Sequence, residues 1–449
     1  MRAAQLRTPR LYPLRPHPEQ FRLWTSPSRF KTVPAGRRSG KTELAKRKVV
    51  KVATGLQRFS DARYFLGAPT RDQAKRIFWD DLKRMVHPYW LAKKPSESEL
   101  CIYLKNFATI WVVGLDVPER IEGVGWDGGI VDEFGNIKPE AWKQNIRPAL
   151  SDRLGWAWLI GVPEGRNHYY HQDKAAKADP TGEWDSFHWK SADILPASEI
   201  EAARRDLDEL TFLQEYEASF VNFEGRAYYP FDERTHARWR LPYVPQWPLV
   251  FCFDFNVSPG CAVVAQEMPT PNDSGIPMLD QMMTGCIGEV FIPHNSNTVM
   301  VCRRLINDWG DHPGEIHCYG DATGGSKGSA KILGTDWDII KDILGRHYGR
   351  DRLKINVPRE NPRERERINS VNTRLKSGAG IVRMMVDPHN CPNLILDFEG
   401  VVTVKGGTGE IDKKKDPMRT HLTDGLGYYI EKEYPIRTRD GGMVEVKGT

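Results

Sequence analysis

The chain contains 449 residues, carries a formal net charge of +5 and has an isoelectric point near 8.7. This length exceeds what one ordinary hydrophobic core supports, so two or three domains are expected, and the mild positive excess is compatible with a polyanionic partner without requiring one. The seven cysteines occur singly and without C-x-x-C pairs, which argues against a disulfide framework or a zinc ribbon. No window approaches the ~20 apolar residues of a spanning helix, and the N-terminus lacks the apolar run of a signal peptide, so we expect a soluble intracellular protein without membrane association.

The first motif in chain order is AGRRSGKT at 35–42, between the strand-like FKTVP and the helix-like ELAKRKVV. A glycine-rich turn from strand to helix directs backbone N–H groups at a phosphate, while its Lys and Ser/Thr reach the β and γ phosphates and magnesium. Ala35 occupies the position of the first expected glycine, which leaves Gly36 and Gly40 to form the tight path. The stretch predicts a nucleotide site, a chance match being the alternative, and its expected contacts are Ala35, Gly36, Arg37, Arg38, Ser39, Gly40, Lys41 and Thr42.

Gln20 lies upstream of this loop, in RPHPEQFRLW. Its side-chain amide could pair with an adenine edge. A helix N-terminus that follows a proline explains the same residues equally well.

Four short apolar runs follow the loop and end in Gly, Pro or an acid, at 63–69, 108–115, 128–134 and 157–163. Such runs are typical of buried parallel strands with functional C-terminal ends, so an α/β domain with a central, mostly parallel sheet is expected. The third run ends at Asp132 and Glu133, which predicts that Asp132 holds magnesium through water and that Glu133 orients the attacking water. A solvated acidic pair is the alternative.

The second half of the chain begins with apolar residues at helical spacing over 197–222, followed by a stretch rich in Pro, Arg and aromatic residues. Strand-like runs then resume at LVFCFDFNVSPGCAVVAQ, and directly joined strands followed later by helices predict a mixed sheet. The expected organisation is a nucleotide-binding domain with a helical lid near its end over 1–222, a linker over 223–239, a second domain over 240–435 and a tail over 436–449.

Three aspartates form the second candidate site. Asp254 interrupts an apolar strand, Asp321 ends another, and Asp424 lies at the entrance of a helix. A carboxylate in such surroundings needs a cation, and three of them can converge on two magnesium or manganese ions that hydrolyse a phosphodiester. Glu289 is a weaker fourth metal ligand, since it also interrupts an apolar strand, with a solvent-facing glutamate as the alternative. For Asp424 the alternative is an acid that stabilises a helix N-terminus.

These motifs together resemble the large terminase subunit of tailed double-stranded DNA bacteriophages, the ATP-driven motor that packages viral DNA. The resemblance rests on AGRRSGKT, IVDEFGN, AWLIGVPEGRNHYYHQ and LQEYEASFVNFEGRAYYPFD, and the order of the three acids is similar to that of an RNase H-like nuclease. It implies a P-loop ATPase domain followed by an RNase H-like nuclease domain. It also implies that Lys41 and Thr42 contact phosphate and magnesium, that Glu133 is catalytic, and that Asp254, Asp321 and Asp424 are catalytic metal ligands.

The resemblance makes LIGVPEG the segment that couples nucleotide state to movement. The family usually has Gly-Thr-Pro or Gly-Ser-Pro there, whereas this chain has Val162, so Asn167 or the backbone is expected to substitute. Transition-state charge also calls for an arginine finger, either Arg37 or Arg38 in cis, or Arg120 or Arg147 from a neighbouring copy. Arg120 is favoured, and a surface arginine is the alternative in each case.

By the same resemblance, the cofactors are ATP and Mg²⁺, with Mn²⁺ possible in the nuclease site. The expected partners are double-stranded DNA, the portal protein of the procapsid, a small terminase subunit and further copies of the chain in a ring. The expected location is the host cytoplasm, with transient docking on the procapsid. A host ATP-dependent repair helicase-nuclease, or a binding protein with an inactive nucleotide loop, are the rival functions. The basic stretch around Lys413, Lys414 and Lys415 could guide a phosphate backbone or form a hairpin without DNA contact.

Overall fold

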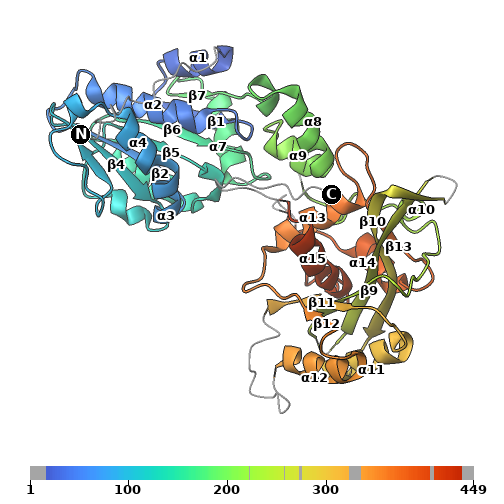
Figure 1. Cartoon of the computed structure of the whole chain (residues 1–449). Coiled ribbons are helices and arrows are strands. Elements are labelled where there is room, and N and C mark those ends of the chain that lie inside the picture. The colour runs from blue at the N-terminus through green and yellow to red at the C-terminus, as the bar shows by residue number, and fades with distance from the viewer. Residues whose placement is uncertain are drawn as a thin grey trace, which may run out of the picture. The chain divides into compact units, whose positions relative to one another are not determined.

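The computed structural model describes residues 17–221, 223–256, 258–272, 276–322, 335–404 and 409–436 (Figure 1). These residues form two compact units. Unit 1 comprises the described residues up to 200 together with 213–221, and unit 2 comprises 201–212 together with the described residues from 223 onward.

Unit 1 is built on a seven-stranded sheet in the order β3-β4-β2-β5-β6-β1-β7. Neighbouring strands run parallel, except that β3 and β4 are antiparallel. The mostly parallel sheet expected from the apolar runs is therefore present. Its strands are β1 Phe30–Pro34, β2 Arg63–Ala68, β3 Cys101–Tyr103, β4 Thr109–Gly114, β5 Gly128–Val131, β6 Trp156–Gly161 and β7 Trp184–Ser186.

Helices cover both faces of this sheet, because alternate strand residues point to opposite sides. Leu66 of β2 packs in one buried cluster with Leu44 and Val49 of α2, whereas Phe65 packs in another with Phe134 and Tyr169. The α-helices are α1 Pro18–Thr25, α2 Lys41–Thr54, α3 Arg71–Ala74, α4 Asp80–Met85, α5 Pro139–Ala141, α6 Arg147–Ala149 and α7 His168–Lys177, and the unit boundaries fall within two more, α8 Ala197–Asp206 and α9 Glu209–Glu215. Short 3₁₀ or π turns lie at Lys75–Trp79, Pro88–Trp90, Pro118–Ile121, Phe134–Asn136, Trp142–Ile146 and Ser191–Asp193.

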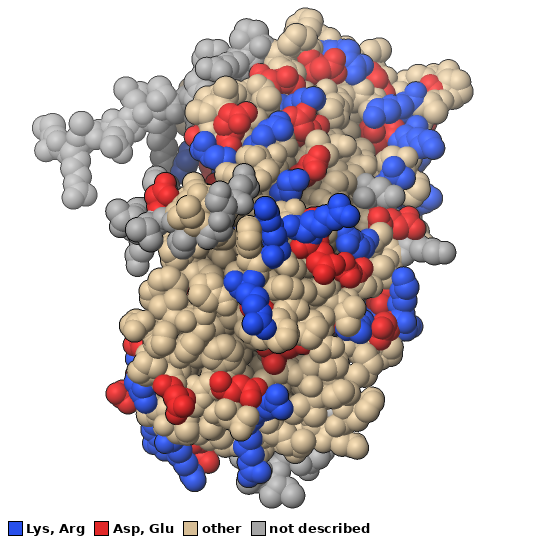
Figure 2. All heavy atoms as spheres, turned by 90° about the vertical axis from the view of Figure 1, so that its right-hand side faces the viewer, with Lys and Arg blue, Asp and Glu red and all other residues tan. Residues whose placement is uncertain are grey.

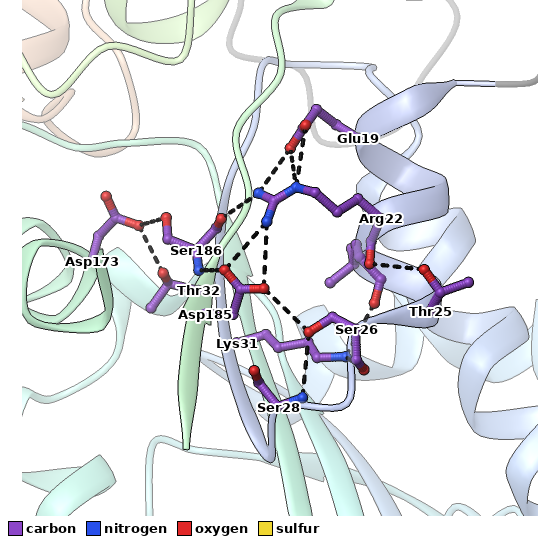
Figure 3. Close-up of polar contacts among 11 residues, drawn as sticks. Glu19, Arg22, Thr25, Ser26, Ser28, Lys31, Thr32, Asp173, Asp185 and Ser186 are labelled. Carbon is purple, nitrogen blue, oxygen red and sulfur yellow. Dashed lines mark hydrogen bonds and ion pairs between the residues drawn. The ribbon is translucent and has the colours of Figure 1, made fainter. Parts of the chain in front are cut away.

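Helix α1 is fixed to the edge of the sheet by a polar cluster (Figure 3). Arg22 Nη1 donates to Asp185 at 3.3 Å, and its Nη2 donates to the Ser186 carbonyl oxygen at 2.6 Å. Lys31 Nζ of β1 donates to the carbonyl oxygens of Leu23 at 3.1 Å and Ser26 at 2.7 Å, which satisfies the C-terminal end of the helix. These bonds hold α1, and with it Gln20, beside the loop that follows β1.

Unit 2 is built on a six-stranded mixed sheet in the order β12-β11-β8-β9-β10-β13. The β8–β9 and β9–β10 pairs are antiparallel, and the remaining pairs are parallel, so the predicted mixed sheet is present. Its strands are β8 Leu249–Asp254, β9 Gly260–Pro271, β10 Pro277–Ile292, β11 Ile316–Gly320, β12 Leu353–Ile355 and β13 Met384–Val386.

The helices of unit 2 enclose two buried clusters. Leu422, Leu426 and Ile430 of α15 belong to one cluster, and Leu305 of α11 and Ile340 of α12 belong to the other. The helices are α10 Glu233–His236, α11 Thr298–Trp309, α12 Asp336–Tyr348, α13 Glu364–Leu375, α14 Pro392–Gly400 and α15 His421–Glu433. On the face drawn in Figure 2, basic and acidic side chains are interspersed.

The expected linker over 223–239 is not a linker in the structure. Its Ala227, Tyr228 and Phe231 are buried in the core of unit 2, and the Ala227 N–H donates to the Val401 carbonyl oxygen at 2.9 Å. The stretch resembles a linker because of its Pro and Arg content, but its aromatic side chains remove enough apolar surface from water to be fixed in place. The expected lid is also divided, since residues 201–212 pack with unit 2.

All seven cysteines are buried and carry free thiols. Among the described residues, none of the helices combines the length and the apolar character that crossing a membrane requires.

Candidate functional site

The stretch 35–42 forms a tight turn between β1 and α2. Gly40 adopts the left-handed conformation, with φ of +83°, and Arg38 does so with φ of +57°. Helix α2 then begins at Lys41, so the first backbone N–H groups of the helix lie where the motif predicts a phosphate. Lys41 is buried.

The structure explains why alanine is accepted at the first position of the motif. Ala35 is fully buried and extends β1 through a parallel bridge to Trp189, so it needs no glycine conformation. Gly36 is the residue without room for a side chain, because an added Cβ would lie 2.7 Å from the Tyr216 carbonyl oxygen and closer still to the Ser191 backbone. The position that requires glycine is therefore Gly36, one residue after the first position of the motif.

The turn is braced from both sides at Ser39. The Ser39 carbonyl oxygen accepts bonds from Gln20 Nε2 and from Trp189 Nε1, each at 3.0 Å, and Ser39 Oγ donates to the Gly36 carbonyl oxygen at 2.5 Å. Gln20 therefore supports the loop with its amide nitrogen, and Pro18 opens helix α1, as expected for a helix N-terminus that follows a proline. Pairing of Gln20 with adenine stays a prediction.

Asp132 and Glu133 follow β5 and face the start of α2. Asp132 Oδ2 accepts a bond from Thr42 Oγ1 at 2.9 Å, and its Oδ1 accepts one from the Glu133 N–H at 2.9 Å. Asp132 is 2% exposed. Glu133 takes a left-handed conformation with φ of +49°, which is uncommon for a non-glycine residue and concentrates at functional sites.

The two acids share one electrostatic environment with Lys41. Burial raises the pKa of Asp132, although Lys41 and the Thr42 hydrogen bond oppose that shift. Burial, followed by repulsion from Asp132, raises the pKa of Glu133 to about 7, again against Lys41. A carboxylate with a pKa near neutrality can accept a proton from water at physiological pH.

Segment 161–167 lies between the two halves of this site, because β6 lies between β1 and β5 in the sheet. Asn167 Nδ2 donates to the Gly135 carbonyl oxygen at 3.0 Å, just after the acidic pair, and Asn167 Oδ1 accepts the Tyr169 N–H at the start of α7. The Gly165 N–H donates to Gln214 Oε1 at 2.9 Å. Both expected substitutes for a hydroxyl at Val162, Asn167 and the backbone, thus make contacts across the site.

The four candidate arginines differ in placement. Arg37 binds Glu215 at 2.9 Å, and Arg38 is exposed on the same turn. Arg147 is paired with Glu183 at 3.4 Å. The Arg120 side chain is 52% exposed and lies 3.8 Å from Asp116. Arg120 acting on a neighbouring copy stays a prediction.

The second site is assembled at one edge of the mixed sheet. Asp254 ends β8 and Asp321 follows β11, and these strands are parallel neighbours with Gly320 opposite Phe253. The carboxyl ends of parallel neighbours meet at the same edge, so the two aspartates emerge side by side. Asp424 lies in the first turn of α15.

Helix α15 approaches this edge closely because of a glycine. A Cβ added to Gly425 would lie 3.1 Å from the Cys252 carbonyl oxygen and 3.2 Å from the carbonyl carbon of Phe253. The small residue lets the helix start rest on the end of β8, and Asp424 thereby comes within electrostatic range of Asp254. The three acids predicted from the sequence are brought to one place: each of them raises the pKa of Tyr428, where burial has the larger effect.

Each of these acids is engaged by protein donors. Asp254 Oδ2 lies 2.9 Å from His421 Nδ1 and accepts from Asn256 Nδ2 at 2.6 Å, and Asp321 Oδ1 accepts from Asn361 Nδ2 at 2.6 Å. Arg367 Nη1 donates to Asp424 Oδ1 at 3.0 Å, and Lys413 Nζ lies 3.4 Å from its Oδ2. Burial raises the pKa of Asp424, and Arg367 and Lys413 oppose the shift.

The acids fit a divalent cation by residue type and by their shared position. Over the part of the chain that the structure describes, however, no three His, Cys, Asp or Glu side chains are spaced to hold a metal ion. Arg367 and Lys413 place positive charge beside Asp424, and His421 contacts Asp254. Lys413 is the most exposed of these three basic residues, at 53% of its side chain, so its contact with Asp424 is the easiest of the three to break.

Glu289 contacts the start of α14 in this structure, and its role as a metal ligand stays a prediction. Its Oε1 accepts the backbone N–H of Asn393 at 2.9 Å and Asn393 Nδ2 at 2.8 Å, while Oε2 accepts the Leu394 N–H at 2.8 Å. Both carboxylate oxygens are used to satisfy the N-terminus of α14, where the helix dipole also favours a negative charge.

A family model described as terminase large subunit, T4likevirus-type, N-terminal, matches residues 33–234. That range contains the phosphate loop, the acidic pair and segment 161–167. The large terminase subunit of Thermus virus P23-45 is 27% identical over 247 residues, which cover 48% of this chain and 50% of that protein. Residues 33–234 of the chain are thus similar to the N-terminal part of large terminases. A further relative, the large terminase subunit of Escherichia phage T5, is 26% identical over 217 residues, or 47% of this chain and 48% of that protein.

The chain spans about half the length of the curated relatives that it matches. Its fold is similar to that of solved large terminases. A large terminase from a thermophilic bacteriophage superimposes with a TM-score of 0.62 and 16% identity, covering 93% of this chain and 99% of that one. A second structure of that phage terminase, in complex with ADP, gives a TM-score of 0.61 at 15% identity, with 92% and 98% covered. The fold class expected from the sequence is confirmed.

Sequence reasoning missed two residues of these candidate sites, Arg367 and Glu215. Arg367 lies in the stretch 359–378, whose alternating charges are typical of a solvated helix, yet its side chain is only 8% exposed and pairs with Asp424. Glu215 lies far from the loop in sequence. The sequence did contain a pattern that predicts burial of α13. Apolar residues such as Ile368 and Val371 lie at helical spacing beside Arg367.

Proposed function

We propose that this chain is the motor subunit of a viral DNA-packaging machine, which hydrolyses ATP to move double-stranded DNA into a procapsid and cuts concatemeric DNA with its second unit. The observation that carries the first activity is the Thr42–Asp132 hydrogen bond of 2.9 Å, which joins the phosphate loop to the acidic pair. The thermophilic phage terminase has the same fold in its complexes with ADP and with ATP-gamma-S.

In the ATPase site, the N–H groups at the start of α2 and the Lys41 ammonium bind the β and γ phosphates. Thr42 and Asp132 would hold Mg²⁺, which neutralises charge on the phosphates when bound. Glu133 orients the attacking water and accepts its proton. Arg120 contacts the nucleotide in the site of a neighbouring copy. Segment 161–167 transmits the change in nucleotide state through Asn167 and Gly165.

In the nuclease site, Asp254, Asp321 and Asp424 would hold divalent cations, Mg²⁺ or Mn²⁺, which activate water and stabilise the leaving oxygen when bound. His421 orients Asp254, and Arg367 orients Asp424. Lys413 leaves Asp424 and contacts the phosphate backbone of the DNA, as the exposed lysines 414 and 415 beside it do.

The partners proposed with this function are double-stranded DNA, the portal protein of the procapsid, a small terminase subunit that selects the sequence, and further copies of the chain in a ring. The setting is the host cytoplasm. A repair helicase-nuclease is the less favoured rival, because the sequence has no second Gly-Lys-Thr and unit 2 is built on a mixed sheet.

A paired assay tests this function. Lys41→Ala is expected to abolish ATP turnover while sparing plasmid cutting in Mn²⁺, and Asp254→Ala is expected to stop cutting while sparing turnover. Loss of both activities in either variant would contradict two separate sites. Stimulation of turnover by DNA together with procapsids distinguishes the packaging motor from a helicase, which responds to DNA alone.

A further inference from the structure

Asp397 of α14 is a buried carboxylate that the proposed function does not use. Its side chain is 1% exposed. Its Oδ2 accepts the Leu422 N–H at 3.2 Å, and its Oδ1 lies 3.5 Å from Arg419 Nη1. Burial raises the pKa of Asp397 to about 7, although Arg419 and the N–H groups of Leu422 and Thr423 oppose the shift. Both oxygens of this acid therefore face the stretch of chain that enters α15.

The backbone at the entrance of α15 is strained. Thr420, the residue before the helix, takes a left-handed conformation with φ of +84°, which is uncommon for a β-branched residue. Its carbonyl oxygen accepts the Asp424 N–H at 2.6 Å and the Thr423 hydroxyl at 2.8 Å. The Leu422 N–H belongs to the first turn, where a helix offers no acceptor of its own. Asp397 supplies that acceptor, and a strained backbone persists only where its surroundings fix it in this way.

The turn that Asp397 holds carries two side chains of the second site. His421 Nδ1 lies 2.9 Å from Asp254 Oδ2, and Asp424 is the third of the predicted metal ligands. Leu422 lies between them in the chain, and its apolar side chain is buried in the core of unit 2. A shift of the Leu422 backbone would therefore move His421 and Asp424 relative to Asp254.

Helix α14 is itself a fixed support for this carboxylate. The ring of Phe398 packs against those of Tyr228 and Phe231, with centroid distances of 5.2 and 4.9 Å. Leu394 of α14 belongs to the same buried cluster as Leu426 of α15. The hydrogen bond from α15 to α14 thus joins two elements of one core, so apolar packing sets where its acceptor lies.

We propose that Asp397 is a positioning residue of the nuclease site, which holds the first turn of α15 so that Asp424 meets Asp254 and Asp321 around the divalent cations. This inference rests on the proposed nuclease function. A group that orients a metal-binding carboxylate from outside is typically worth about 10- to 100-fold in metal affinity or activity. Asp397 acts through the backbone of Leu422 rather than by contact with the cations or the DNA, so its loss is expected to change how tightly the site binds metal.

The test compares two substitutions of nearly the same shape. Asp397→Leu removes the acceptor, whereas Asp397→Asn keeps a carbonyl oxygen for the Leu422 N–H. The matched control is Glu399→Leu, which places the same side chain at an exposed position of the same helix. Mn²⁺ binding is measured without nucleotide by electron paramagnetic resonance of the free ion, with the Asp254→Ala variant as background. Plasmid cutting is measured across a range of Mn²⁺ concentrations.

We expect Asp397→Leu to weaken Mn²⁺ binding and to raise the Mn²⁺ concentration for half-maximal cutting by about 10- to 100-fold, with Asp397→Asn and the control within about threefold of the unaltered chain. All measurements are made below the temperature at which calorimetry detects unfolding of unit 2, so lowered stability by itself leaves them unchanged. Unchanged Mn²⁺ binding in folded Asp397→Leu would overturn the proposal, as would an equal loss in Asp397→Asn or in the control.

Two further outcomes keep the proposal separate from folding and from the proposed function. Should Asp397→Leu not fold, a loss of Mn²⁺ binding in folded Asp397→Asn would still overturn the role of Asp397. Absence of Mn²⁺-dependent cutting by the unaltered chain would instead contradict the proposed nuclease function, and the comparison of Mn²⁺ binding would still decide whether Asp397 positions Asp424.

Discussion

Removing the guanidinium from the buried Arg367–Asp424 pair is expected to destabilise unit 2 in a pH-dependent way. The two side chains are 8% and 10% exposed and lie 3.0 Å apart. Deleting one partner of a buried ion pair costs about 3–5 kcal/mol, because the other charge is left without compensation. Lys413 remains 3.4 Å from the second Asp424 oxygen, so the lower end applies to Arg367→Met, at about 3 kcal/mol. For a domain of roughly 150–250 residues this lowers the Tm by about 6–12 °C.

The pH dependence follows from the raised pKa of Asp424, which burial causes and Arg367 opposes. Without Arg367 this pKa rises further. A carboxyl whose folded pKa lies above its unfolded value destabilises the protein increasingly as pH rises from the unfolded to the folded pKa. The deficit of Arg367→Met is therefore expected to be larger at pH 8 than at pH 5, and Asp424→Asn in the same chain is expected to remove that difference.

The assay is differential scanning calorimetry of the protein without added metal, with Mg²⁺ and ATP-gamma-S added in a parallel run to mark the transition of unit 1. Arg346→Met is the matched control, because the pair that Arg346 forms with Asp342 is exposed, at 75% and 48%, and is worth about 0.5 kcal/mol. A Tm loss in Arg367→Met no larger than in this control, or one that is equal at pH 5 and pH 8, would refute the reasoning.

Three further predictions concern the other sites. Because the pKa of Glu133 is about 7, kcat for ATP is expected to rise with pH through that value and to be abolished in Glu133→Gln; a flat pH profile of kcat from 6 to 8 would argue against Glu133 as the proton acceptor. Gly36→Ala is expected to weaken nucleotide binding at least tenfold, measured by fluorescent ADP titration, because its Cβ would meet the backbone of Ser191 and Tyr216. Glu289→Ala is expected to lower the stability of unit 2 by about 1–3 kcal/mol through lost bonds to α14 while sparing plasmid cutting of the folded protein; loss of cutting without loss of stability would support Glu289 as a metal ligand instead.

Local patterns predicted much of this fold. Continuous apolar runs ending at Asp132 and Asp254 correctly indicated buried strands that end at an acid, since a strand buried on both faces has few other compositions available to it. The tight turn at 35–42 was equally predictable, because few sequences direct several N–H groups at one point. Unit 2 was predictable as a mixed sheet from its directly joined strands.

Interactions between distant segments could not be predicted in the same way. Glu289 looks like Asp254 in sequence, because both are acids within an apolar run. Only the hydrogen bonds that Glu289 accepts from the start of α14 distinguish the two. Arg367 looks solvated because its neighbours are charged, and its burial depends on α15 packing against α13. Aromatic residues of the expected linker, such as Tyr228, are buried because the chain near Val401 returns to pair with them.

The chain passes between the two units three times, at 200–201, 212–213 and 222–223. These crossings limit where the two units can be separated or exchanged. A single cut after residue 222 would leave residues 201–212 on the wrong fragment, with the surface they bury in unit 2 newly open to solvent. Recombination that exchanges unit 2 for that of a related protein must therefore also bring a matching stretch for residues 201–212, or the hybrid packs poorly.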